Sequence, residues 1–201
     1  MTSVVVLYEP VADGDHGFPL LSVRLGEPVE TIIANNPELK VEQTADGETV
    51  FTSPTGGESG IRNSEINAAL VIWARGYGGV VFDSSTLFRL PDGALRSPDA
   101  SWIQAARWQS LSDQERKTFP PVAPDFVIEL RSQTDRLTDL QDKMKEYASC
   151  GVRLGWLIDP LLKQVHIYRS SEAPVVLSEP NGVSDEAFLP GFVLDLSRIF
   201  A

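Results

Sequence analysis

The stretch from Pro124 to Pro160 constrains the fold more than any other part of this sequence. Its pattern predicts a strand over residues 126–131, a helix, and a second strand over residues 152–158 in close succession. The first strand is mostly apolar, yet it contains Glu129 at a position where a buried strand would not carry a carboxylate. This carboxylate needs a functional or structural explanation.

Side chains alternate between the two faces of a strand. Glu129, Arg131 and, if the strand continues, Gln133 are therefore expected on one face, while the apolar residues pack on the other. The strand ends in the segment 132–135, where any of the last residues can cap the following helix.

The helix between the two strands has one apolar stripe at helical spacing, formed by Leu137, Leu140, Met144, Tyr147 and Ala148. Lys143 lies near the edge of this stripe, so its long side chain can reach back towards the polar end of the sheet. Gly151 is the natural left-handed residue at the end of the helix.

Shorter elements surround this unit. The pattern predicts a short helix over 27–35, a hairpin of 39–43 and 49–53 with Asp-Gly at its turn, a loop over 54–60, and a helix from Asn63 or Ser64 to about Gly76. Strands are expected over 80–83, 86–90, 96–103 and 164–169, short helical turns over 104–124, and weaker strands over 175–177 and 192–196.

With 201 residues, the chain is most simply an N-terminal arm and short helix over 1–36 followed by a single domain over 37–201. The single cysteine, Cys150, excludes an internal disulfide and favours a reducing compartment. We find neither a secretory signal nor an apolar run of about 18 residues, so we expect a cytoplasmic protein that does not enter a membrane. The net charge of −11 disfavours nucleic-acid binding, unless basic residues in the middle of the chain cluster locally.

Asp99 is a second carboxylate in a strand-forming run, and together with Glu129 it can converge on a hard cation. Mg²⁺ typically binds through one or two carboxylates while keeping waters and phosphate oxygens as further ligands. A lysine near such a site would orient a water molecule or stabilise charge. The alternatives remain that Asp99, which follows a proline, is a turn residue and that Lys143 is a solvated helix charge.

The order of the motifs resembles the Uma-type restriction endonuclease family of the PD-(D/E)xK nuclease superfamily. The resemblance rests on RNSEINAALVIWAR from Arg62, VVFDSSTLFRLPDGALRSPDASWI from Val80, PPVAPDFVIELRSQTDRL from Pro120, LQDKMKEYASCGVRLGWLIDP from Leu140, and HIYR from His166. It implies a restriction-endonuclease-like α/β fold, a mixed β-sheet flanked by helices, here with an N-terminal hairpin extension.

The resemblance also implies a site and a reaction. Asp99 and Glu129 would bind Mg²⁺ or Mn²⁺, and Lys143 on the following helix would replace the superfamily lysine, whose usual place is taken by Arg131. Arg131 would then contact phosphate, with Lys145 the second choice for the lysine. Glu65 would be the accessory acid of the first helix, and Gln133 departs from the family's usual proline.

The implied function is hydrolysis of DNA phosphodiester bonds by a metal-dependent endonuclease. The alternative is a catalytically silent nuclease-fold module that regulates or binds another protein, which the acidic net charge favours. A homodimer is the expected form of an enzyme that cuts two strands, with Val4–Leu7 as a strand that two copies would exchange.

Overall fold

The computed structural model describes residues 21–36, 39–52 and 55–201, so the segment Val4–Leu7 lies outside the described residues. Its helices are α1 (Val29–Asn35), α2 (Gly57–Tyr77), α3 (Ala105–Gln109), α4 (Asp113–Lys117) and α5 (Leu137–Ser149). Within the described ranges, no helix is both long and apolar enough to cross a membrane.

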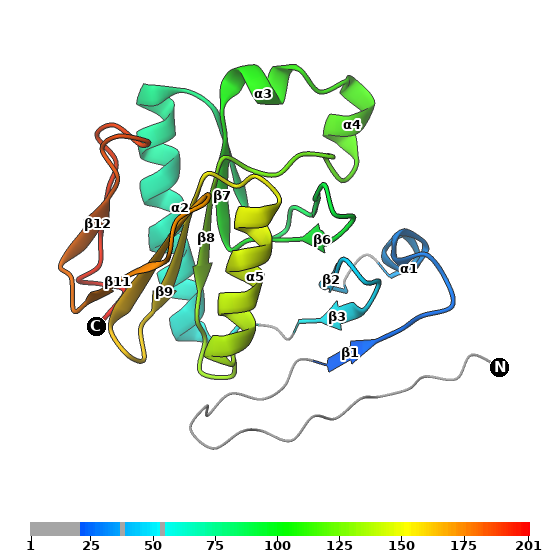
Figure 1. Cartoon of the computed structure of the whole chain (residues 1–201), viewed down its shortest axis with the longest axis horizontal. Coiled ribbons are helices and arrows are strands. Elements are labelled where there is room, and N and C mark those ends of the chain that lie inside the picture. The colour runs from blue at the N-terminus through cyan, green and yellow to red at the C-terminus, as the bar shows by residue number, and fades with distance from the viewer. Residues whose placement is uncertain (1–20, 37–38, 53–54) are drawn as a thin grey trace.

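A mixed sheet forms the centre of the protein (Figure 1). Its strands follow the order β11 (Val175–Ser178), β10 (Gln164–Arg169), β9 (Leu154–Asp159), β8 (Phe126–Leu130), β7 (Ala100–Ile103) and β4 (Val80–Asp83). Only the β8–β9 pair in this order is parallel, and the helix that connects these two strands is α5. The predicted strand-helix-strand unit and the mixed sheet are therefore confirmed.

Helices α2 and α5 cover opposite faces of this sheet (Figure 1). Alternation along β8 explains this arrangement, because Ile128 packs with Leu70 of α2 whereas Val127 packs with Met144 of α5. Each large side chain that is fully buried in this way contributes about 1.5–3 kcal/mol to folding. Glu129 follows Ile128 and therefore projects to the α5 side of the sheet.

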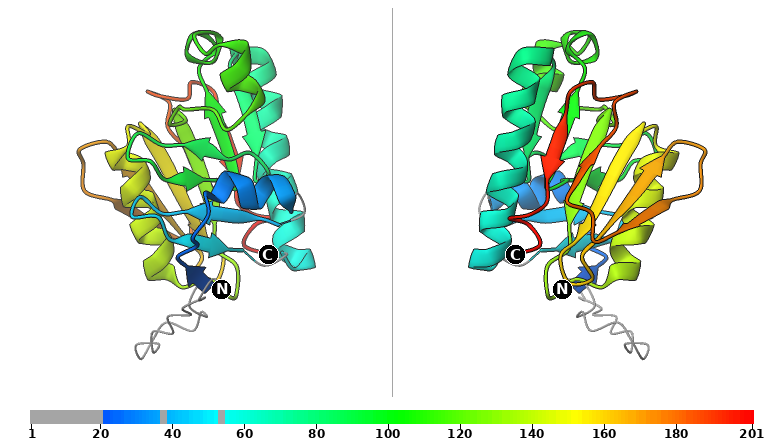
Figure 2. Two further views of the ribbon diagram at one scale, coloured as in Figure 1. Left: turned by 90° about the vertical axis from the view of Figure 1, so that its right-hand side faces the viewer. Right: turned by 90° about the vertical axis from the view of Figure 1, so that its left-hand side faces the viewer.

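A second, smaller sheet lies on the α5 side of the central sheet (Figure 2). Its strands follow the order β1 (Leu21–Val23), β3 (Thr49–Phe51), β2 (Val41–Gln43), β6 (Leu95–Arg96) and β5 (Phe88–Arg89). The predicted hairpin is confirmed, since β2 and β3 pair antiparallel around a turn in which Gly47 has a φ of 86°. Helix α1 packs on this sheet through Val29, which contacts the cluster of Val41 and Leu95 across the boundary expected at residue 36.

The structure differs from the predicted elements in two places that matter for the site. Helix α2 begins at Gly57, so the predicted loop is wrong for residues 57–60 and the predicted caps at Asn63 or Ser64 are wrong. Its first turn contains Glu58, which is favoured at that end of a helix and forms an ion pair with Arg62, and these interactions offset part of the glycine cost. The sequence pattern does not predict strand β12 (Gly182–Ser184), which pairs with β13 (Val193–Asp195).

The second difference is that the predicted strand over 96–103 is divided between the two sheets. Strand β6 belongs to the small sheet and β7 to the central sheet, and residues 97–99 pass between them. Pro98 lies at this crossing, where its missing N–H costs no ladder hydrogen bond. The crossing brings Asp99 to the point where the two sheets meet.

Helix α5 packs closely on the central sheet because Gly155 of β9 has no side chain. A Cβ atom at Gly155 would collide with the end of Met144 and lie 3.3 Å from Cγ2 of Val127. Because α5 packs so closely on the sheet, other side chains on its sheet-facing side come within reach of Glu129.

Candidate active site

Asp99 lies at the start of β7 and is tied to the end of β8. Its Oδ2 atom accepts a hydrogen bond of 2.9 Å from the backbone N–H of Leu130. Its backbone carbonyl accepts a hydrogen bond of 3.1 Å from the side chain of Asn67 on α2. The carboxylate is therefore fixed next to β8, one residue away from Glu129.

Glu129 is buried under α5, with 3% of its surface exposed. Its Oε1 atom accepts a hydrogen bond of 2.9 Å from the hydroxyl of Tyr147 and lies 2.9 Å from Nζ of Lys143. Lys143 and Tyr147 are one helical turn apart on α5, so both point to the same side of the helix. The structure thus brings Asp99, Glu129 and Lys143 together in one cluster.

Glu42 of β2 is part of this cluster, and the sequence analysis did not identify it. Its Oε1 atom accepts hydrogen bonds of 2.8 Å from Nζ of Lys143 and 3.0 Å from the backbone N–H of Ser97. Its Oε2 atom accepts a hydrogen bond of 3.2 Å from Nη1 of Arg96. The sequence signal was weak, because Glu42 stands in a three-residue strand whose next residue, Gln43, is also polar.

Burial and neighbouring charges change the pKa values of these groups. Burial raises the pKa of Glu129 to about 7, and the nearby charges of Asp99 and Glu42 add to this increase although Lys143 opposes it. Burial also raises the pKa of Asp99, against the hydrogen bond from Leu130. Burial alone would raise the pKa of Glu42 too, but the charges of Lys143 and Arg96 outweigh it and the pKa is lowered.

The pKa values of Lys143 and Tyr147 are both raised. Burial alone would lower the pKa of Lys143, but its two carboxylate partners raise the pKa above its usual range. The amine is therefore an ammonium near neutral pH and cannot accept a proton there. The pKa of the Tyr147 hydroxyl is raised well above its usual value by burial and by the charge of Glu129, so the hydroxyl stays protonated and donates to Glu129.

The carboxylates fit a divalent cation of the Mg²⁺ type. In the described parts of the chain, no hydrogen bond engages Oδ1 of Asp99 or Oε2 of Glu129, so each carboxylate has one oxygen available as a ligand. Within the same residues, no set of three or more His, Cys, Asp or Glu side chains is arranged to hold a metal ion. Two carboxylates nevertheless suffice for Mg²⁺, which typically completes its shell with waters and phosphate oxygens.

Glu65 does not lie in this cluster. It is two residues from Asn67 on α2, which corresponds to about 200° around the helix, so the two side chains point to different sides. Its Oε1 atom lies 2.8 Å from Nη1 of Arg198 near the C-terminus. Its position therefore does not match that of an accessory acid beside Asp99 and Glu129.

Arg131 and Gln133 are also placed outside the cluster. Nη1 of Arg131 lies 2.9 Å from Oδ2 of Asp159 at the end of β9, and its Nε donates to the backbone carbonyl of Asp135. The guanidinium is thus bound to the neighbouring strand end. Strand β8 ends at Leu130 and so does not continue to Gln133, which is exposed in the turn before α5.

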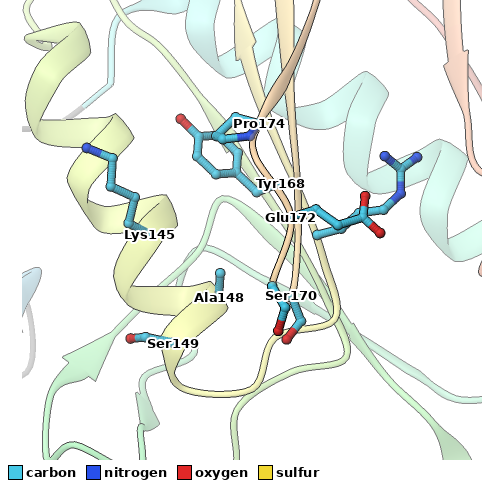
Figure 3. Close-up of a pocket in the computed structure, with 9 residues that line it drawn as sticks. Lys145, Ala148, Ser149, Tyr168, Ser170, Glu172 and Pro174 are labelled. Carbon is cyan, nitrogen blue, oxygen red and sulfur yellow. The ribbon is translucent and has the colours of Figure 1, made fainter.

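Lys145, the second choice for the lysine, faces a different region (Figure 3). It borders a hollow of about 470 Å³ next to the C-terminal half of α5, lined also by Ala148, Ser149, Tyr168, Arg169, Ser170, Ser171, Glu172 and Pro174. Nζ of Lys145 forms an ion pair with Asp142, and Arg169 forms one with Asp185. The basic groups beside this hollow are therefore already matched by acids, and we assign no ligand to it.

Comparison with known proteins places the chain in a family. The family model described as "Uma2: Putative restriction endonuclease" matches residues 27–197. The chain therefore belongs to the Uma2 family. This family's description points to a nuclease, and the resemblance described above is confirmed.

One solved structure supports the fold of this Uma2 member. It is a protein from Anabaena variabilis described as a "putative nuclease belonging to DUF820", with a TM-score of 0.67 and 22% sequence identity. The match covers 80% of this chain and 89% of the other. This likeness supports the predicted restriction-endonuclease-like fold. No curated protein matches the chain.

Proposed function

We propose that this protein is a divalent-metal-dependent endonuclease that hydrolyses DNA phosphodiester bonds. The observation that carries the proposal is the buried cluster in which Asp99 and Glu129 each keep a carboxylate oxygen available while Lys143 contacts Glu129 at 2.9 Å. Two acids that can hold a cation, with a fixed positive charge beside them, suit metal-assisted phosphodiester hydrolysis. Membership of the Uma2 family supports the same reaction class.

Asp99 and Glu129 would hold Mg²⁺ or Mn²⁺ through Oδ1 and Oε2. When bound, the cation supplies Lewis-acid chemistry: it polarises the scissile phosphate and lowers the pKa of a water molecule. The burial that raises the pKa of both carboxylates also strengthens their attraction for a cation, since few waters compete there.

Lys143 and Tyr147 act on this pair without taking up a proton. The ammonium of Lys143 donates hydrogen bonds and so orients the attacking water or a phosphate oxygen, and it stabilises the negative charge that develops on the phosphate. Tyr147 donates a hydrogen bond to Oε1 of Glu129 and so fixes the orientation of this carboxylate, whose Oε2 would be the oxygen available to a cation. The water oxygen forms a bond to phosphorus as the bond from phosphorus to the leaving sugar oxygen breaks. The proton of the water passes to solvent, and the leaving sugar oxygen takes up a proton from solvent.

Nicking of supercoiled plasmid DNA in the presence of Mg²⁺ or Mn²⁺ tests the proposal. We expect cleavage by the wild type and its loss in Asp99→Asn, Glu129→Gln and Lys143→Met, all prepared identically. Lys145→Met is the matched control, since this lysine lies on the same helix but is exposed and outside the cluster. Absence of cleavage by the wild type, or equal cleavage by all the variants, would refute the assignment of this reaction to this site.

A further inference from the structure

Glu42 contributes to the cluster from a different sheet than the other acids. It lies on β2 of the small sheet, whereas Asp99 and Glu129 belong to β7 and β8 of the central sheet or precede them directly. Only 4% of its surface is exposed. An ionised carboxylate is kept in such a place only if several donors compensate its burial.

Three donors surround this carboxylate, and one of them is Lys143. Ser97 and Arg96 approach Glu42 from the chain segment that leads into Asp99. Arg96 is itself held by Glu146 of α5, to which it donates from Nη2 at 3.0 Å and also from Nε. Because Lys143 and Glu146 lie on the same side of α5, Glu42 and Arg96 connect the small sheet to the helix at two points.

Lys143 is therefore shared by two carboxylates, at 2.8 Å from Glu42 and 2.9 Å from Glu129. The two partners are not equivalent in the proposed reaction. A cation held by Glu129 would neutralise part of the carboxylate's negative charge, so the attraction between Glu129 and the ammonium would weaken. The contact with Glu42 would not change in this way, because Glu42 is not one of the proposed metal ligands and accepts hydrogen bonds from Arg96, Ser97 and the lysine itself.

We infer that Glu42 is a positioning residue, which holds the Lys143 ammonium beside the reacting phosphate while Glu129 is bound to the metal. This inference rests on the proposed function and assigns a role to the small sheet within it. A misplacement of about 1 Å in a group that acts on the transition state costs about 10²-fold in rate. Loss of Glu42 should therefore reduce kcat by about that factor without changing metal binding.

The competing interpretation is that Glu42 only joins the small sheet to α5. The two interpretations differ in what they predict for folded protein. A joining role lowers thermal stability and leaves the turnover of each folded molecule unchanged. A positioning role lowers kcat while the increase in Tm caused by Mg²⁺ stays at the wild-type value.

The first variant is Glu42→Gln/Arg96→Gln, which removes both charges of the ion pair between Glu42 and Arg96. The second is Glu42→Gln alone, where Arg96 keeps Glu146 as its partner. The matched control is Glu30→Gln, which removes the ion pair between Glu30 and Arg89 that joins α1 to the same small sheet, outside the cluster. Plasmid cleavage, the Tm with and without Mg²⁺, and the ¹H–¹⁵N signal of the Lys143 ammonium are measured for each.

We expect both Glu42 variants to lose about 10²-fold in kcat with an unchanged Mg²⁺-induced increase in Tm, and the Glu30 variant to cleave like the wild type. If either folded Glu42 variant keeps the wild-type kcat, the inference is overturned and the proposed function stands. If the wild type cleaves nothing, the proposed function fails and the ammonium signal decides the inference. A signal that persists with Mg²⁺ in the wild type and disappears in the variants supports positioning by Glu42, and one that persists in all of them overturns it.

Discussion

The raised pKa of Glu129 predicts that the metal-free protein becomes less stable as the pH rises through neutrality. The carboxyl has a pKa of about 7 in the folded protein against a usual value of 4.5. The folded state therefore binds this proton more tightly than the unfolded state, which stabilises the fold below pH 4.5, and the contribution is lost as the pH rises to about 7. Asp99, whose pKa is also raised, contributes in the same direction.

The size of the effect follows from the two pKa values. At about 1.4 kcal/mol for each pKa unit, the full contribution of Glu129 is about 3 kcal/mol. Between about pH 5.5 and pH 8.5 the loss is about 2 kcal/mol, which for a chain of this size lowers Tm by about 4–8 °C. No discount for solvent applies, since Glu129 is 3% exposed.

The assay is thermal unfolding across this pH range in the presence of a chelator, with Glu129→Gln as the comparison. The comparison is needed because burial lowers the pKa of His166, which destabilises the fold as the pH falls and so has the opposite sign. We expect the wild type to lose Tm relative to Glu129→Gln as the pH rises, and saturating Mg²⁺ to reverse the trend by binding the ionised carboxylate. Parallel pH profiles of the two proteins in chelator would refute the reasoning.

Three further substitutions test individual contacts. Tyr147→Phe removes the hydrogen bond to Glu129 and should cost about 1.5–3 kcal/mol of stability and reduce cleavage, as measured by urea unfolding and nicking; unchanged stability would contradict this contact. Arg131→Met removes the ion-pair partner of the buried Asp159 and should lower the free energy of unfolding by about 3–5 kcal/mol. Cleavage by the folded fraction should persist. A selective loss of DNA affinity would instead support contact between Arg131 and phosphate. Glu65→Gln should change neither plasmid cleavage nor metal-induced stabilisation, because its ion pair is exposed; a loss of metal binding would place Glu65 in the site after all.

The sequence predicted the elements whose patterns are local. Residues 126–158 contain a period of two, a period of 3.6 and a glycine at the helix end, and all three features lie within single elements, so β8, α5 and β9 follow. The start of α2 could not be predicted in this way. The three glycines between residues 56 and 60 are typical of a loop, because glycine disfavours a helix. The contacts that α2 makes in the folded chain outweigh this local preference for a loop.

The candidate site was predictable to the extent that its residues stand out within their own elements. Glu129 is a carboxylate in an apolar strand, and Lys143 lies at the edge of an apolar stripe, so each is unusual locally. Glu42 is not, because its partner Lys143 lies 101 positions away and the small sheet approaches α5 only in the folded chain. A long-range ion pair of this kind leaves no periodic trace in a single sequence.

The positions of Arg131 and Lys143 relative to Glu129 have a structural reason. Strand β8 ends at Leu130, so the side chain two residues after Glu129 extends past the sheet, where Asp159 at the end of β9 binds it. A donor from this position would have to abandon a buried partner in order to reach Glu129, at a cost of several kcal/mol. Helix α5 offers a shorter route, because the absence of a side chain at Gly155 lets the helix pack closely enough for Lys143 to reach Glu129 from above the sheet. A lysine delivered from the helix also needs a second anchor once a cation competes for Glu129, and the small sheet supplies that anchor in Glu42. In the proposed site, Lys143 on α5 and Glu42 on the small sheet therefore act together.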